Sequence, residues 1–371
     1  PRRRRRLGTM PPAAEDVVEL EHAIGVSALR GGLHYHCNGR EYLYAAGASI
    51  VVCSFDDPHD QSFLRGHDDS VTCVALSPQG TYVASGQSGE NADCIVWDYA
   101  TKSLQFRLSE HDHSVVAVAF SHDELLLCTL GGRDDGKLIV WDLSNGCIVS
   151  TVMNKEAASC VAFGGFVRDV KRRDTQNYQF CTAGSTKATM WSLDPYSGAL
   201  ESERVTTEGA TVRKTTCLVF SNDFTTIYCG TTSGDFTRIT VRQGKMAFKP
   251  IYANGGGVEA LLVTAKGGVV TGGGDGCVTS FTSDLEELAK LKLPAPVVAL
   301  SFAPDGSELV AAIRNGAIYR LRGDLSRALL VCENHALPVR AAAYARDSSD
   351  RFATASTDKT LRVWDANDYK A

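Results

Sequence analysis

Two neighbouring histidines are the first residues in this sequence whose type and spacing could support chemistry. His34 and His36 flank Tyr35, so they share one face of a predicted strand, where two imidazoles can chelate a metal. No third ligand stands near them in the sequence. We therefore interpret them as a packed or solvent-facing pair, and we expect no metal site.

A glycine-rich segment, Gly131–Lys137, nearly matches the Gly-x4-Gly-Lys-Ser/Thr loop that binds nucleotide phosphates. Leu138 replaces the hydroxyl residue that would bind magnesium, and Asp134 and Asp135 would repel phosphate. The segment also joins two predicted strands, so it has no helix N-terminus to receive an anion. We expect no nucleotide and no other cofactor.

Histidines and aspartates at two places, His111 with Asp135 and His335 with Asp358, could form catalytic dyads. No recognisable motif places a nucleophile beside either pair. The sequence therefore predicts that the protein is not an enzyme.

The twelve cysteines stand singly, mostly within apolar runs, and no Cys-x-x-Cys occurs. Zinc sites need paired soft ligands at short spacing, which is missing here. Reduced cysteines that act as small buried hydrophobic residues of a cytosolic protein are the favoured interpretation.

The charge argues against two classes of partner. The chain carries 38 Lys and Arg against 43 Asp and Glu, a net charge of −5, and five of the cations form the run Arg2–Arg6, so the rest carries −10. An acidic body binds nucleic acid and anionic lipid poorly. No apolar stretch approaches the roughly 18 residues of a membrane span. We expect residues 1–15 to be a disordered basic tail or an expression remnant, and residues 16–369 to form the folded domain.

A repeat organises that domain. Tryptophans close four similar segments, and the same slot recurs with other residues, so that eight slots stand 40 to 50 residues apart, at positions 53, 97, 141, 191, 238, 281, 321 and 364. Each unit contains several short β-rich runs separated by turn residues, and none has a sustained helical period. Four strands per unit of this length is the signature of a β-propeller blade.

The units resemble those of the WD-repeat family, because three have a histidine near the start, in Gly66-His67, Glu110-His111 or Asn334-His335, and three have Trp-Asp near the end. The resemblance implies an all-β propeller of four-stranded antiparallel blades, and it implies a structural hydrogen-bonded tetrad in some units. The last unit matches all four positions, and two earlier units match less completely. The residues concerned are His335, Thr354, Asp358 and Trp364 in the last unit, His111, Thr129, Asp135 and Trp141 in the third, and His67, Ser85 and Trp97 in the second.

The number of blades stays open between seven and eight. Val17–Val26 has the pattern of a lone outer strand, and such a strand can complete the last blade and hide both sheet edges. Eight blades would result. Alternatively, seven units close the ring and the eighth begins a second propeller.

The longest insertion, Gly164–Asn177, is expected to be irregular and contains Arg168, Lys171, Arg172 and Arg173. Four cations on an acidic chain are candidates for binding an acidic partner. A solvated variable loop is the alternative.

Several segments resemble the cilia- and flagella-associated protein 52 family more closely than the generic repeat, among them Glu19–Gly25, Phe63–His67, Ala92–Tyr99, Leu130–Gly136 and Tyr228–Asp235. Echinoderm-microtubule-associated-like proteins and a centriolar WD-repeat relative share weaker versions. The resemblance is to the N-terminal half of a protein with two propellers.

That resemblance implies a non-enzymatic structural component of ciliary or flagellar doublet microtubules, located in the axoneme or the centriole. Its implied partners are tubulin, microtubules and neighbouring axonemal or centriolar proteins, and the chain would act as a monomer within that larger assembly. An adaptor or substrate receptor of a signalling or ubiquitin-ligase complex is the alternative function.

Overall fold

The computed structural model of this chain describes residues 20–57, 59–154, 158–169, 171, 173–185, 188–206, 213–246, 250–347, 350–367 and 369. These residues form antiparallel sheets, which confirms the all-β prediction. The helical structure among them is the three-residue turn η1 (Val241–Gln243).

Seven sheets follow one another along the chain, and each takes its first four strands in sequence order. The first two sheets contain β1 (Leu33–Tyr35), β2 (Glu41–Ala46), β3 (Ser49–Ser54) and β4 (Gln61–Arg65), then β5 (Val71–Leu76), β6 (Tyr82–Gln87), β7 (Cys94–Asp98) and β8 (Ser103–Leu108). The third and fourth contain β9 (Val115–Phe120), β10 (Leu126–Gly131), β11 (Lys137–Asp142) and β12 (Cys147–Met153), then β13 (Ala158–Arg168), β14 (Asp174–Gly184), β15 (Ala188–Leu193) and β16 (Leu200–Arg204).

The remaining sheets repeat the pattern with two departures. The fifth contains β17 (Thr215–Phe220), β18 (Thr226–Thr231), β19 (Asp235–Thr240), β20 (Lys245–Met246) and β21 (Ile251–Tyr252), and both short strands pair with β19. The sixth and seventh contain β22 (Val258–Val263), β23 (Val269–Gly273), β24 (Cys277–Phe281) and β25 (Glu287–Lys292), then β26 (Val297–Phe302), β27 (Glu308–Ile313), β28 (Ala317–Arg322) and β29 (Ala328–Glu333). The eighth has three strands, β30 (Val339–Tyr344), β31 (Arg351–Ser356) and β32 (Leu361–Asp365).

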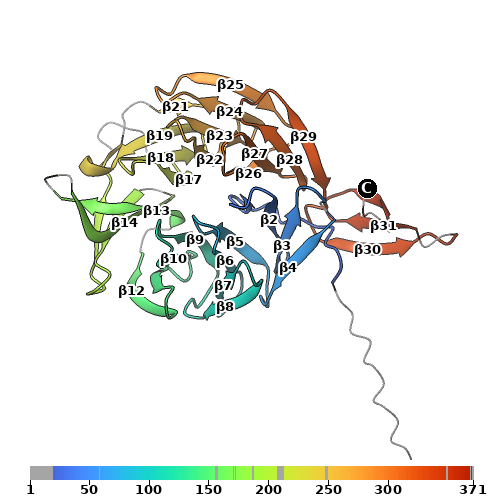
Figure 1. Ribbon diagram of the computed structural model, residues 1–371, viewed down its shortest axis with the longest axis horizontal. Coiled ribbons are helices and arrows are strands. Elements are labelled where there is room, and N and C mark those ends of the chain that lie inside the picture. The colour runs from blue at the N-terminus through green and yellow to red at the C-terminus, as the bar shows by residue number, and fades with distance from the viewer. Residues whose placement is uncertain are drawn as a thin grey trace, which may run out of the picture.

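The first seven sheets surround a common centre (Figure 1). The first strand of each sheet contacts the first strand of the next, and β1 contacts both β5 and β26, so the ring closes between the first and seventh sheets. Apolar side chains fill the spaces between neighbouring sheets. Between the first and second sheets, for example, Leu43 and Val52 pack with Val74 and Trp97. The structure thus has seven blades in the ring.

The eighth sheet lies outside this ring, beside β3 and β4 (Figure 1). Every residue of β30 is exposed, whereas the first strands of the ring sheets are largely buried or half-buried. The eighth unit therefore adds no blade to the ring, because the first seven already bring β1 against β26.

The described part of the expected outer strand Val17–Val26, residues 20–26, does not form a strand of the last blade. Within the described residues 20–26, Gly25 makes one parallel bridge with His335, where the backbone N–H of Val26 donates to the His335 carbonyl (2.9 Å) and the N–H of His335 donates to Ile24 (2.9 Å). No described residue pairs with the outer side of β32. Residues 17–19 lie outside the described residues. The first sheet needs no added strand, because residues 33–65 supply all four.

Deleting residues 1–26 is expected to lower the free energy of unfolding by about 1.5–3 kcal/mol, because Val26 is only 4% exposed in the core between the first and seventh sheets. The deletion also removes both backbone bonds to His335, so proteolysis within residues 335–369 should accelerate. Deleting residues 1–12 is the control and should change neither quantity. Equal melting temperatures and proteolysis rates for the two truncated chains would contradict this account.

Candidate functional site

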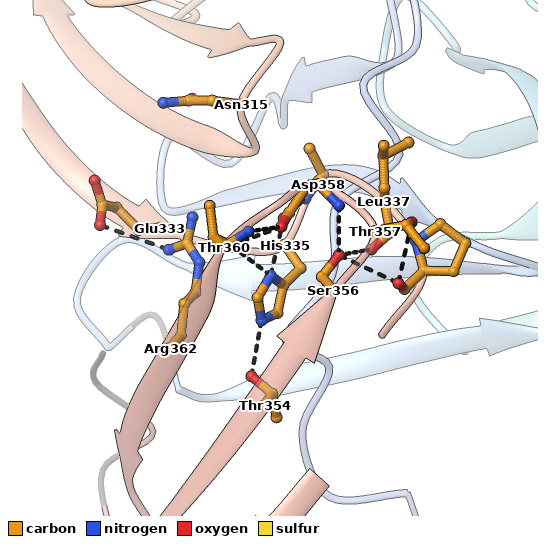
Figure 2. Close-up of polar contacts among 12 residues, drawn as sticks. Asn315, Glu333, His335, Leu337, Thr354, Ser356, Thr357, Asp358, Thr360 and Arg362 are labelled. Atoms are coloured by element: carbon orange, nitrogen blue, oxygen red, sulfur yellow. Dashed lines mark hydrogen bonds and ion pairs between the residues drawn. The ribbon is translucent and has the colours of Figure 1, made fainter. Parts of the chain in front are cut away.

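The tetrad of the eighth unit is brought together as a continuous hydrogen-bond chain, of which Figure 2 shows the part that joins Thr354, His335 and Asp358. His335 follows β29, and its Nδ1 lies 2.8 Å from Oδ2 of Asp358, while its Nε2 lies 2.7 Å from Oγ1 of Thr354. The indole Nε1–H of Trp364 donates to the same Oγ1 at 2.6 Å. Because the hydroxyl accepts from the indole, its own proton goes to Nε2, so Nδ1–H donates to Asp358.

Asp358 is the acceptor at the end of that chain. Burial opposes its charge, but hydrogen bonds from Thr360 and His335 outweigh burial and hold the pKa of the Asp358 carboxyl well below its usual range. Figure 2 shows both donors turned toward this carboxylate. The ionised carboxylate fixes the turn between β31 and β32 against the segment that enters β30.

The third unit repeats this arrangement inside the ring. His111 Nδ1 lies 2.7 Å from Asp135 Oδ2 and its Nε2 lies 2.8 Å from Thr129 Oγ1, to which Trp141 donates at 2.9 Å. Both the imidazole and the carboxylate are fully buried. Burial lowers the pKa of His111, although the hydrogen bond with Asp135 opposes that shift.

The second unit completes its tetrad with a residue that the sequence did not reveal. His67 Nδ1 lies 2.8 Å from Gln87 Oε1 and its Nε2 lies 2.6 Å from Ser85 Oγ, and Ser85 Oγ accepts from Trp97 Nε1 at 2.9 Å. The amide oxygen of Gln87 takes the place of the carboxylate. Gln87 ends β6, two residues after Ser85, whereas Asp135 lies in the turn after its strand, so spacing alone did not identify it.

The sixth unit retains the geometry without histidine. Asn254 is fully buried, and its Oδ1 accepts from Thr271 Oγ1 at 2.6 Å while its Nδ2 donates to the Cys277 carbonyl at 3.0 Å and lies 3.3 Å from Thr279 Oγ1. Its position in the unit is the sequence signal that could have identified Asn254. It precedes its hydroxyl partner Thr271 by 17 residues, much as the tetrad histidine His111 precedes Thr129 by 18.

The hydroxyl–imidazole–carboxylate order of the tetrads is also that of a catalytic triad. The hydroxyl oxygens of Thr129 and Thr354 are buried, however, and each already accepts an indole N–H. A nucleophile needs an open approach to its substrate, and these oxygens have none. The arrangement fixes strands and turns within a sheet.

His34 and His36 do not face a shared ligand. The Nε2 atoms bond to different carbonyls of the second sheet, Val74 for His34 (3.1 Å) and Gly80 for His36 (3.1 Å), and the His36 ring stacks on Tyr99. Burial lowers the pKa of His34. Across the part of the chain that the structure describes, no group of three or more His, Cys, Asp and Glu side chains is arranged for a metal, and none of its helices could span a bilayer. All twelve cysteines are free thiols.

Asp358→Ala is expected to lower the free energy of unfolding of the eighth sheet by about 1–3 kcal/mol, because it leaves the buried His335 imidazole without its acceptor. Partner binding by the folded fraction should stay unchanged. Differential scanning calorimetry and a binding assay on the same preparation check this. An unchanged unfolding transition together with lost binding would show that Asp358 contacts the partner.

The expectation that the basic insertion is an irregular loop is wrong. The insertion is a β-hairpin, because β13 continues to Arg168 and β14 already begins at Asp174. Arg168 Nε lies 3.1 Å from Asp174 Oδ1, and Arg173 Nη2 lies 3.0 Å from Asp169 Oδ2. Lys171 is exposed, and Arg172 lies outside the described residues. The structure therefore pairs two of the four cations with carboxylates of the same hairpin.

Aromatic rings from the neighbouring sheets hold the base of this hairpin. A Cβ at Gly164 would lie 2.7 Å from the Phe220 ring, and one at Gly165 would lie 2.6 Å from the Phe224 ring, so both positions need glycine for this packing. Phe166 meets His122 edge-on at 4.7 Å between ring centroids. A fixed base that carries an exposed, charged tip can present that tip to a partner.

Comparisons with known proteins agree with this architecture. The chain is 32% identical over 363 residues to cilia- and flagella-associated protein 52 of Chlamydomonas reinhardtii, which covers 95% of this chain and 57% of that protein. It is 28% identical over 368 residues to the human protein of the same name, again over 95% of this chain and 57% of the relative. The chain thus spans somewhat more than half the length of these relatives.

The crystal structure of the Myceliophteria thermophila Cps50 (Swd1) β-propeller domain matches with a TM-score of 0.57 at 17% identity, covering 80% of this chain and 97% of that one, which supports the fold alone. The model "WD domain, G-beta repeat" matches residues 326–365. The model "Echinoderm microtubule-associated protein first beta-propeller" matches residues 60–318, most of the ring. The chain therefore belongs to the family of the first β-propeller of echinoderm microtubule-associated proteins.

Proposed function

We propose that this protein is a non-enzymatic structural scaffold of the doublet microtubules of cilia and flagella, where it binds tubulin and neighbouring axonemal proteins. The observation that carries the proposal is the similarity to cilia- and flagella-associated protein 52, which extends over about 95% of the chain in relatives as distant as an alga and human. The match to a microtubule-associated propeller family supports the same assignment.

The described structure fits a scaffold in two respects. The polar groups of the tetrads are buried and bonded to one another, so they stabilise the sheets and leave no reactive group open. The β13–β14 hairpin adds a feature that a propeller ring does not need, an anchored extension whose described end carries the exposed Lys171 beside the paired Arg168 and Arg173. Because tubulin has an acidic surface and this chain is acidic overall, contact would depend on such local basic groups.

Co-sedimentation of the full chain with taxol-stabilised microtubules tests tubulin binding. We expect the chain to pellet with microtubules in a saturable manner at low ionic strength, and to remain in the supernatant without them. Microtubules treated with subtilisin, which lack the acidic tails of tubulin, distinguish binding to these tails from binding to the tubulin body. A chain that stays in the supernatant at all microtubule concentrations would refute direct tubulin binding.

A further inference from the structure

A pocket of about 410 Å³ lies where the first sheet, the outer strand β29 of the seventh sheet and the eighth unit meet. In Figure 1 this is the junction between the ring and the projecting eighth sheet. Trp364 of the eighth-unit tetrad is among the lining residues, but the other lining residues belong neither to the tetrads nor to the hairpin. Its lining combines two kinds of side chain, carboxylates and aromatic rings, that together select one kind of ligand.

Three carboxylates line the pocket, those of Asp56, Asp57 and Glu333, and the lining residues include no Lys or Arg. Asp56 and Asp57 are exposed, so their charges are accessible to a ligand from solvent. Glu333 is half-exposed and forms an ion pair with Arg362, whose Nη1 lies 3.5 Å from Oε2 of Glu333. Arg362 is not one of the residues that line the pocket. The balance around the pocket is therefore negative and favours a cation.

Aromatic rings form another part of the lining. His22 stacks on Tyr369 with ring centroids 4.3 Å apart and planes within 6°, and His59 lies 5.6 Å from His22. Gln61 holds His22, because its amide accepts from the Ala23 N–H (2.8 Å) and its Nε2 lies 3.2 Å from His22 Nε2. Burial, and then the neighbouring His59, lower the pKa of His22 to about 4, so this imidazole is uncharged at neutral pH and does not repel a cation.

We propose that this pocket binds an arginine side chain of a protein partner. A guanidinium is planar, stacks on aromatic rings and donates to carboxylates in pairs, and the lining offers both kinds of contact. A lysine ammonium would gain from the charges but has no flat face to stack. This site has the opposite charge preference to the basic hairpin, so it would bind a different partner from the acidic surface of tubulin.

Titration of the full chain with acetyl-arginine methylamide tests the site. Binding is followed by NMR through the ring C–H signals of ¹³C-labelled histidines. We expect the signals of His22 and His59 to shift and that of the buried His111 to stay fixed. The citrulline analogue has the same shape without the charge and should bind about tenfold more weakly. Equal binding of the two compounds, or no shift at His22 and His59, would overturn the proposal.

The double variant Asp56→Asn/Asp57→Asn should weaken arginine binding about tenfold, because it removes two negative charges. The turn should keep its shape, because the side-chain amide oxygen of residue 57 can still accept from the backbone N–H of His59, as Asp57 does at 3.0 Å. Asp284→Asn/Glu286→Gln is the matched control, since both residues are exposed in the corresponding turn of the sixth sheet. Unchanged affinity of the first variant would refute the site.

Deleting residues 1–12 tests whether the chain occupies its own pocket. If this deletion strengthened arginine binding tenfold or more, the Arg2–Arg6 run of the chain itself would be the occupant, and the proposal that the arginine comes from a protein partner would be overturned. None of these outcomes depends on tubulin binding.

Discussion

Replacing Trp97 with alanine is expected to lower the free energy of unfolding of the ring by about 3–5 kcal/mol. The Trp97 side chain is 1% exposed and packs in the core between the first and second sheets. Its loss creates a cavity and leaves the Ser85 hydroxyl without the indole donor. Chemical denaturation of the purified protein, followed by far-UV circular dichroism, measures the change.

Two other substitutions separate the causes. Trp97→Phe keeps a ring in the core but removes the N–H, so it should cost less, about 1–2 kcal/mol. Trp364→Ala removes the equivalent indole in the eighth sheet, which lies outside the ring, so the main unfolding transition should stay in place. If Trp364→Ala shifted that transition as much as Trp97→Ala, the ring and the eighth sheet would unfold as one cooperative unit, contrary to the arrangement described above.

Reversing the charge of all four hairpin cations, Arg168, Lys171, Arg172 and Arg173, is expected to weaken association with microtubules by more than about tenfold, because each contact with an acidic partner is worth tenths of a kcal/mol to a few kcal/mol. Folding should survive, since exposed charges usually change stability by less than about 0.5 kcal/mol. Co-sedimentation at several salt concentrations measures the effect, which should shrink at high salt.

Because Arg168 and Arg173 pair with Asp174 and Asp169, charge reversal also places like charges together within the hairpin. Replacing the four cations with glutamine avoids this repulsion and should still weaken association. Reversal of four exposed arginines on other sheets, Arg65, Arg238, Arg322 and Arg327, is the matched control for total charge. Equal losses in the hairpin variant and in this control would leave only a non-specific charge effect and would contradict the docking role.

Part of the fold could be predicted from the sequence because it depends on residue types at a fixed spacing. A histidine, a hydroxyl, a carboxylate and a tryptophan recur at such a spacing, and the structure brings His335 and His111 together with the partners expected for them. Gln87 and Asn254 were missed for a physical reason. An amide can supply the same acceptor or donor as a carboxylate or imidazole, so the geometry persists while the residue type changes.

The hairpin and the ring closure show the other limit. Two adjacent glycines, Gly164 and Gly165, have the sequence pattern of a loop, but they lie within β13. Glycine is needed there because a Cβ would meet the rings of Phe220 and Phe224. Those rings lie more than 50 residues away in the sequence, so no local pattern reveals the contact. Spacing counts eight units but does not say which are neighbours in space. The contact of β1 with β26 decides that seven units close the ring.

Imaging the tagged full-length protein in a ciliated cell, followed by extraction of isolated axonemes with detergent and high salt, tests the central claim of an axonemal scaffold most directly. We expect a signal along the whole axoneme and retention of the protein on the doublet microtubules after extraction. A protein spread through the cytoplasm and absent from washed doublets would contradict it.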